Sequence, residues 1–297
     1  MFFPVSNIEI PLWLPPVAAF IISFFTSMGG ISGAIFLLPF QVSVLGITAP
    51  NVSATNFAFN IFAIPGGVYR YFKEGRICLP ILWVILAGTI PGLFIGTYMR
   101  QTVFLEQNTF KLFCGFVLLL VALRMVSELL RYELQKKSEV SIKKLNHQIP
   151  LHSKINILEF NWLTIRLEFE GKTYKISSIK LFFICCIVGV VGGAYGIGGG
   201  AIISPFLVSL FGLPIYIVAG VSLIGTFITS IFGVTLYSYM SMSADWLLGF
   251  LFGIGGFLGI YLGALCQRFV PQNPIKILLV IILLFLGIRY ILLYFLR

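Results

Sequence analysis

Long segments without a charged residue recur from about Pro11 to the C-terminus, and most match or exceed the roughly 20 residues that cross a bilayer. Only 10% of the 297 residues are charged, against about 25% in a typical soluble domain. A very apolar soluble protein is the disfavoured alternative. The sequence therefore predicts an all-α polytopic membrane protein.

The apolar segments predict about eight transmembrane helices. They lie near 14–46, 51–70, 77–99, 109–131, 179–211, 214–239, 246–267 and 274–296. A polar stretch from 132 to 178 separates the first four from the last four. We therefore expect a first transmembrane repeat over 1–131, an insert over 132–178 and a second transmembrane repeat over 179–297.

The two halves of the chain resemble each other. "SGAIFLLPFQVSVLGI" aligns with "GGGAIISPFLVSLFGL", and the alignment places Pro39 on Pro205 and Gly46 on Gly212. Further sets match in the same order: the glycines at 88, 92 and 96 with those at 255, 259 and 263, and Lys111 and Arg124 with Lys276 and Arg289. This order predicts an internal duplication. Such repeats are common in secondary transporters, whose substrate site lies at the repeat interface.

Glycines interrupt the first apolar segment of each half. "GGAYGIGGG" (192–200) lies inside the segment 179–211, which as one helix would be about 50 Å long, against about 30 Å of hydrocarbon. The segment 14–46 has the same excess length and its own cluster, "MGGISGAIFLLP". We therefore expect both first helices to be broken at their glycines.

A broken helix within the membrane indicates a binding site, because unwound backbone is tolerated there only where protein buries it or a cavity adjoins it. A helix that restarts near Gly200 would direct unpaired N–H groups and the positive end of its dipole to that point. Glycine also lets a solute approach the backbone closely. The glycines expected to bind a small anion are Gly29, Gly30, Gly33, Gly196, Gly198, Gly199 and Gly200.

The alternative interpretation is that glycines only permit close helix packing. We favour it for the two sets spaced four residues apart, at 88, 92 and 96 and at 255, 259 and 263.

Neutral polar side chains supply further candidate ligands. Asn56 and Asn60 lie four residues apart, on one helical face, and align with Ser222 and Thr226 in the second half. As substrate-binding residues these four would complete the anion site. They could equally form interhelical hydrogen bonds, worth about 0.6 kcal/mol each on average.

Several other functions are disfavoured. "GIGGGA" at 196–201 fits a dinucleotide motif, but the acidic residue that the motif needs about 20 positions later is missing, and no Walker motif follows. The cysteines have no paired metal spacing, and His147 and His152 are isolated in the insert, so no cofactor or metal is predicted. The net charge of +10 is concentrated in the insert and at helix ends, which indicates membrane orientation rather than nucleic-acid binding.

Four spans per half would put both termini and the insert on one side, which the positive-inside rule makes the cytoplasm. If the glycine breaks instead turn back as re-entrant hairpins, each half crosses three times and the halves are inverted. Within the insert, "LTIRLEFEGKTYKIS" alternates apolar and polar residues around Gly171 and predicts a β-hairpin in a small cytoplasmic subdomain.

The two motifs "GGISGAIFLLPF" and "YGIGGGAIISPFLVSLFGLP" resemble the TauE/SafE family of sulfite exporter-like permeases. The resemblance covers nearly all of the chain except about 132–178, and the first motif departs from the second in having Ser32 where the second has Gly198. It implies transport of small anions, often sulfur-bearing ones such as sulfite or sulfoacetate, across a bacterial inner membrane.

The expected function is therefore secondary transport of a small anion by alternating access. A channel-like anion pore is the alternative, and a membrane-embedded enzyme is disfavoured because the histidines lie in the insert and the carboxylates lie at the edges of the spans. The expected partners are a small anionic solute and membrane lipid, without nucleic acid. The sequence leaves open whether the chain forms a homo-oligomer.

Overall fold

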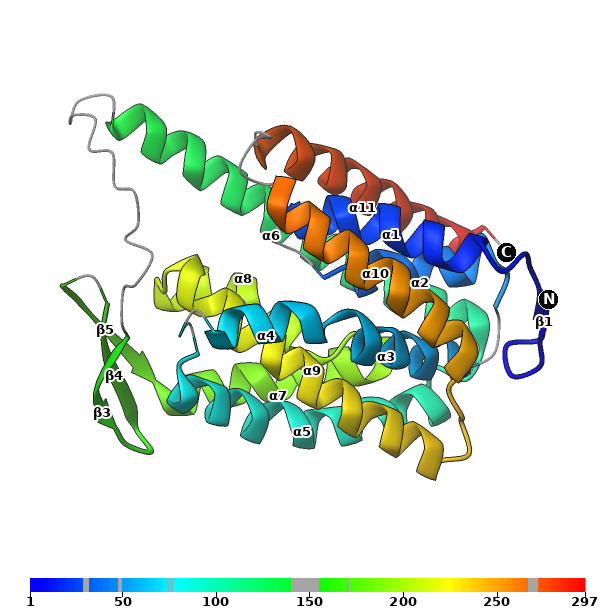
Figure 1. The fold of residues 1–297 in the computed structure, drawn as a ribbon, viewed down its shortest axis with the longest axis horizontal. Helices are drawn as coiled ribbons and strands as arrows, with labels where there is room; N and C mark the ends of the chain where they lie inside the picture. Colours follow the sequence, from blue (N-terminus) through cyan, green and yellow to red (C-terminus); the bar gives the residue numbers. More distant parts are fainter. Residues whose placement is uncertain are drawn as a thin grey trace.

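The computed structural model describes residues 1–28, 32–47, 50–73, 75, 77–139, 155–169, 171–266 and 272–296. This part of the chain folds as an elongated helical bundle with a small β-sheet at one end (Figure 1). The first half contains α1 (Leu14–Met28), α2 (Ala34–Ser43), α3 (Asn51–Ala63), α4 (Pro65–Lys73), α5 (Leu79–Thr102) and α6 (Gln107–Glu139). The second half contains α7 (Ser178–Tyr195), α8 (Gly199–Phe211), α9 (Ile215–Tyr239), α10 (Trp246–Cys266) and α11 (Gln272–Phe295).

Six helices among the described residues are long and apolar enough to cross a membrane, where the sequence predicted about eight. They are α5, α6 over Gln107–Ser127, α7, α9 over Ile217–Tyr239, α10 and α11. The difference arises because the expected spans 14–46 and 51–70 are each divided into two shorter helices, whereas the divided span 179–211 still contributes α7. The 15 residues of α1 rise about 22 Å at 1.5 Å each, which is short of a full crossing.

The expected break in the second half is present between α7 and α8. Gly196 and Gly198 have φ values of +85° and +76°, which residues with a Cβ rarely adopt. Gly196 ends α7 by donating its N–H to the carbonyl oxygen of Gly192 at 2.9 Å. The chain then turns back. The helices α5, α7 and α9 all run in one direction, whereas α8 runs antiparallel to α9 (Figure 1). The break is thus a hairpin.

Glycines spaced four apart bring two helix pairs into backbone contact. On α5, a Cβ at Gly88 would lie 2.6 Å from the carbonyl oxygen of Phe182 on α7. On α10, a Cβ at Gly259 would lie 2.5 Å from the carbonyl oxygen of Phe20 on α1. Both pairs are parallel, since residue numbers rise together along the two helices. The packing interpretation of these glycines is confirmed.

The predicted β-hairpin is also confirmed. β4 (Thr164–Phe169) pairs antiparallel with β5 (Lys172–Ser177), and β3 (Asn156–Phe160) adds to β4 as an edge strand. Gly171 makes the turn with a φ of +72°. One face buries Ile165, Leu167 and Ile176 completely.

The insert and the termini do not share one end of the bundle, contrary to the expectation from four spans per half. Figure 1 shows both termini at one end of the long axis and the β3–β4–β5 sheet at the other. Each half therefore finishes at the end opposite its start. The physical reason is the reversal at the glycine break, because a segment that turns back changes the number of passes from even to odd.

The N-terminal residues close the end of the bundle that carries the termini. The short strands β1 (Phe2–Phe3) and β2 (Ile8–Glu9) form a hairpin. The Ser6 hydroxyl donates to a carboxylate oxygen of Asp245 at 2.9 Å, before α10, and the side-chain amide of Asn51 donates to the carbonyl oxygen of Val5 at the start of α3.

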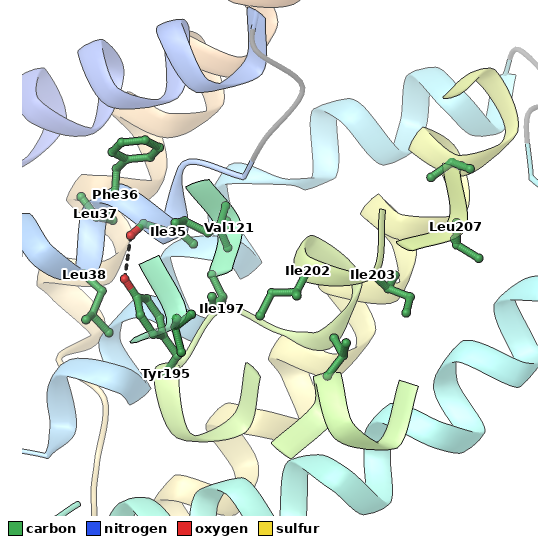
Figure 2. Packing of buried hydrophobic residues seen from close by; sticks show 14 of the residues in the cluster. Ile35, Phe36, Leu37, Leu38, Val121, Tyr195, Ile197, Ile202, Ile203 and Leu207 are labelled. Atoms are coloured by element: carbon green, nitrogen blue, oxygen red, sulfur yellow. Dashed lines mark hydrogen bonds between the residues drawn. The ribbon is translucent and has the colours of Figure 1, made fainter. Parts of the chain in front are cut away.

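The two glycine-rich segments lie next to each other in the core. The Tyr195 hydroxyl at the end of α7 donates to the carbonyl oxygen of Ile35 in the first turn of α2, at 2.8 Å. Figure 2 shows this hydrogen bond with Ile197 and Val121 packed beside it. Segments about 160 residues apart, as the separation of these two residues shows, thus meet inside the bundle.

Candidate functional site

A cavity of about 180 Å³ lies between the two glycine breaks. About 15 Å³ of such space holds one water, so the cavity has room for a small solute. Helices of both halves line it, since Gly33 precedes α2 and Gly200 lies in the first turn of α8. Its hydroxyl and amide side chains outside tyrosine are Ser27, Ser32, Asn60, Ser204, Ser222 and Thr226.

The structure brings five of the predicted site residues together around this cavity: Gly33, Asn60, Gly200, Ser222 and Thr226. Asn56, Gly196, Gly198 and Gly199 are not among the lining residues. Gly29 and Gly30 lie outside the described residues.

The first turns of two helices adjoin the cavity, through Gly33 before α2 and through Gly200 and Ala201 in α8. α2 follows Gly33 and α8 follows Gly198, and neither of these cap residues supplies a side-chain hydrogen bond to its helix. The first N–H groups of a helix have no acceptor within the helix, and they carry the positive end of its dipole. The Ser32 hydroxyl accepts from the N–H of Ala34 at 3.4 Å and so occupies one of these donors. Unpaired N–H groups of these first turns would give the cavity wall a partial positive charge without a formally charged side chain.

Asn56 is committed to the protein itself. Its side-chain nitrogen donates to the carbonyl oxygens of Gly196 at 3.1 Å and Ala34 at 3.0 Å. Its side-chain oxygen accepts from Gln41 at 3.5 Å. These contacts favour the interhelical interpretation of Asn56, because no donor is left for a solute.

Asn60 and Ser222 retain unpaired polar atoms. The Asn60 nitrogen donates to the carbonyl oxygen of Ile197 at 3.1 Å and to the Ser230 hydroxyl at 3.2 Å, whereas its side-chain oxygen is buried without a hydrogen-bond partner. The Ser222 hydroxyl is likewise buried and has no partner. A buried unpaired polar atom is costly, so atoms of this kind beside a cavity are candidate ligand contacts.

Thr226 contributes less than expected as a donor. Its hydroxyl donates to the carbonyl oxygen of Ser222 at 2.8 Å, one turn earlier in α9. Ser222 and Thr226 are the two hydroxyl residues among the four polar residues predicted from the sequence. Of these two, only Ser222 has a hydroxyl that the described structure leaves available to donate.

The glycines near the α7–α8 turn are also needed for packing. A Cβ at Gly200 would overlap the backbone carbonyl of Ser222 and lie 2.5 Å from the nitrogen of Thr226. A Cβ at Gly198 would lie 3.0 Å from the Thr229 hydroxyl. Gly200 thus lies both in a close helix contact and in the cavity wall.

Formal charges are absent from the described lining of the cavity. Among the described residues, no group of three or more His, Cys, Asp or Glu side chains could hold a metal ion. The described cysteines are free thiols.

Sequence reasoning missed Ser27, Ser32, Ser204, Tyr71 and Tyr261 in the lining. The available signal was a polar residue within an apolar span, which holds for Ser27 and Ser204. Arg100 lies in the last turn of α5, where its side chain is fully buried, stacks 3.7 Å from the centroid of the Phe110 ring and donates to the carbonyl oxygen of Phe104. Arg100 thus stabilises the turn between α5 and α6, away from the cavity.

The chain is similar in sequence to known membrane proteins. A curated relative, the probable membrane transporter protein YunE of Bacillus subtilis (strain 168), is 22% identical over 272 residues, which covers 89% of this chain and 92% of that protein. No solved structure matches the chain. The family model described as sulfite exporter TauE/SafE matches residues 16–290. Because this match spans nearly the whole chain, the protein belongs to the sulfite exporter TauE/SafE family of membrane transporters.

Proposed function

We propose that the protein is a secondary transporter of a small anion, which binds in the cavity between the N-termini of α2 and α8. The observation that carries the proposal is that the first turns of both helices adjoin one cavity, with Gly33 and Gly200 in its wall. Family membership and the name of the Bacillus relative support membrane transport as the general function.

The donors at the cavity suit an oxyanion. Backbone N–H groups at a helix N-terminus bind sulfate, phosphate and carboxylate groups without a basic side chain. The buried Ser222 hydroxyl adds one donor from α9. Sulfite, a small organosulfonate or a small carboxylate would fit both the donors and the volume, and the family description supports sulfite.

We further infer that the two halves are inverted repeats around this cavity. The parallel pair α1–α10 corresponds to the parallel pair α7–α5 if the halves exchange places. Gly46 and Gly212, which the sequence alignment pairs, have φ values of +70° and +64° after α2 and α8. Inverted repeats with a central site support alternating access, in which one repeat moves against the other.

The sequence predicted that both termini face the cytoplasm. The charge distribution along the bundle supports the opposite orientation in the membrane. Lys172 and Lys175 belong to β5, and Lys180 lies in the first turn of α7 directly after it, so these lysines are at the end of the bundle that carries the sheet. By the positive-inside rule this end faces the cytoplasm of a bacterial inner membrane, and the termini face the other side. An epitope tag at each terminus, probed in intact spheroplasts, would be accessible in this orientation and protected in the opposite one.

Solute counterflow tests the transport function. Proteoliposomes loaded with unlabelled sulfite are diluted into labelled sulfite, with sulfoacetate, acetate and phosphate as competitors. A transient accumulation of label, inhibited by at least one competitor, is expected of a carrier. Label that equilibrates without overshoot would indicate a channel, and no movement of any solute by folded protein would contradict transport of these anions.

A further inference from the structure

An exposed apolar surface follows β3 and the turn after it. Its side chains are about half to almost fully exposed: Ile157 at 49%, Leu158 at 51%, Phe160 at 53%, Trp162 at 96% and Leu163 at 66%. The next strand, β4, instead buries Ile165 and Leu167 completely, so the sheet already has a packed face. A contiguous exposed apolar surface of this kind marks contact with another body.

Two hydrogen bonds tie this turn to the beginning of a membrane-spanning helix. The N–H of Ser178 donates to the carbonyl oxygen of Leu163 at 3.1 Å, and its hydroxyl donates to the carbonyl oxygen of Asn161 at 3.2 Å. Ser178 is the first residue of α7, one of the six helices able to cross the membrane. The first residue of such a helix lies near the boundary of the hydrocarbon, so the turn lies at that depth as well.

The surface of α7 beside the turn is also apolar and exposed. Ile179, Phe183 and Ile187 are spaced four residues apart and form one stripe along the helix, with exposures of 46%, 62% and 67%. The opposite face of α7 packs against α5 through Cys185 and the glycines described above. In a spanning helix this exposed stripe faces lipid, and it begins one residue after Ser178.

We propose that the turn from Asn161 to Leu163 docks on the headgroup region of the bilayer, with Trp162 as its anchor. Trp residues concentrate at membrane interfaces because the ring is apolar and its N–H remains a donor. Exposed Lys175 and Lys180 nearby match the negative surface of the cytoplasmic leaflet. The partner is thus the lipid surface itself, on the side where α7 enters it.

Docking would fix the depth of α7 in the membrane. The other end of this helix is the glycine turn at Gly196, whose carbonyl oxygen binds Asn56. The insert would in this way keep the glycine turn at the other end of α7 at a constant depth in the membrane. The proposal rests on the membrane topology of the chain and not on the identity of the transported anion.

Fluorescence quenching of a single tryptophan tests the proposal. In the variant Trp13→Phe/Trp83→Phe/Trp246→Phe, the indole of Trp162 is the sole tryptophan of the full chain. The variant is reconstituted into liposomes that contain lipid brominated either near the headgroup or at mid-chain. We expect a blue-shifted emission that shallow bromines quench strongly, mid-chain bromines quench less and aqueous iodide barely affects.

A matched control moves the indole to the far end of the hairpin. Trp162→Phe with Lys172→Trp, in the same background, places it at the β4–β5 turn, about 20 Å away along six-residue strands. We expect iodide to quench this indole and lipid bromines to leave it unchanged. Circular dichroism and size-exclusion profiles establish that both variants fold.

Three results would overturn the proposal. Strong iodide quenching of Trp162 would place the turn in water. Shielding of Trp162 from both iodide and brominated lipid would indicate a protein cover, such as a second copy of the chain. Equal lipid quenching at both positions would show that the whole sheet lies on the membrane, without a specific anchor at the turn.

Discussion

The side-chain nitrogen of Asn56 lies 3.1 Å from the carbonyl oxygen of Gly196, the residue that ends α7 in a left-handed conformation. The same nitrogen donates to Ala34 at 3.0 Å, in the first turn of α2. A single side chain of α3 thereby joins the two broken helices of the two halves. The carbonyl group of Gly196 follows the last residue of α7 and has no partner within that helix, and the membrane interior offers no bulk water.

Replacement of Asn56 by leucine is expected to destabilise the protein and to reduce transport. The carbonyl group of Gly196 would be left unpaired, at a cost of about 1–3 kcal/mol, and the contact with Ala34 would be lost as well. Thermal unfolding in detergent and counterflow in liposomes would measure the two effects. Thr235→Ala is a suitable control, because the exposed Thr235 hydroxyl only binds the carbonyl oxygen of Ile231 in its own helix. Equal unfolding temperatures for the Asn56 variant and the parent protein would contradict this assignment.

Two alanine substitutions test whether the close packing at Gly200, rather than the loss of any helical glycine, determines the effect of a replacement. Gly200→Ala would force a methyl group onto the Ser222 carbonyl, whereas a Cβ at Gly225 meets nothing closer than the Ile85 side chain at 3.4 Å. We expect Gly200→Ala to lower both stability and transport. Gly225→Ala should be neutral or stabilising by up to about 1 kcal/mol, because alanine favours the helix.

Both variants are purified in the same way, and the amount of folded protein is measured before transport is assayed. If both variants behave alike, the contact between α8 and α9 does not set the requirement for glycine at 200. Unchanged counterflow by Gly200→Ala would in addition remove Gly200 from the cavity wall as a critical element.

Substitution of Ser222 distinguishes a ligand contact from a structural one. Its hydroxyl is buried and unpaired, so Ser222→Ala should leave the unfolding temperature unchanged or raise it. A hydrogen bond to a charged ligand contributes about 1.5–3 kcal/mol, so the apparent affinity for the anion should fall about tenfold or more. Ser230→Ala is the counterpart, since that hydroxyl accepts from Asn60 and its loss should affect stability. An unchanged affinity in Ser222→Ala would exclude this residue from the site.

The sequence predicted the position of the α7–α8 break, the β-hairpin and the packing glycines. These features follow from local rules: glycine density, alternation of apolar residues and a spacing of four. The reversal of α8 was one of two alternatives that the sequence left open, because hydropathy measures the length of an apolar segment and not its direction. The number of spans and the relation between termini and insert both depended on that reversal.

The candidate site was predicted in part for a similar reason. Composition places polar residues within the spans, but the hydrogen bonds they make depend on which backbone groups the breaks leave unpaired. Asn56 and Asn60 occupy equivalent positions one turn apart, yet only Asn60 lines the cavity. The burial of Arg100 was likewise invisible, because the fold of the α5–α6 turn that covers it is a tertiary feature.

A cation–π contact links the two halves near the site. The Arg124 guanidinium of α6 lies 4.4 Å from the centroid of the Phe206 ring on α8. Phe206→Leu should weaken this link by about 0.5–2 kcal/mol and lower the unfolding temperature, whereas Phe206→Tyr retains an aromatic face and should not. Identical unfolding of the two variants would show that the ring contributes by volume alone.

The pH dependence of binding should come from the ligand and not from the site. The described lining of the cavity contains no Asp, Glu, His, Lys or Cys, the groups whose protonation commonly alters anion binding near neutral pH. The equilibrium affinity for an alkyl sulfonate, whose charge is constant, should therefore be flat between about pH 6 and 8. Sulfite and hydrogensulfite interconvert near neutral pH, so the apparent affinity for total sulfite should change over the same interval. Isothermal titration calorimetry of both ligands on the detergent-solubilised protein measures this contrast. A sulfonate affinity that falls as the pH rises would require a titrating protein group at the site, and the uncharged cavity would then not be where the anion binds.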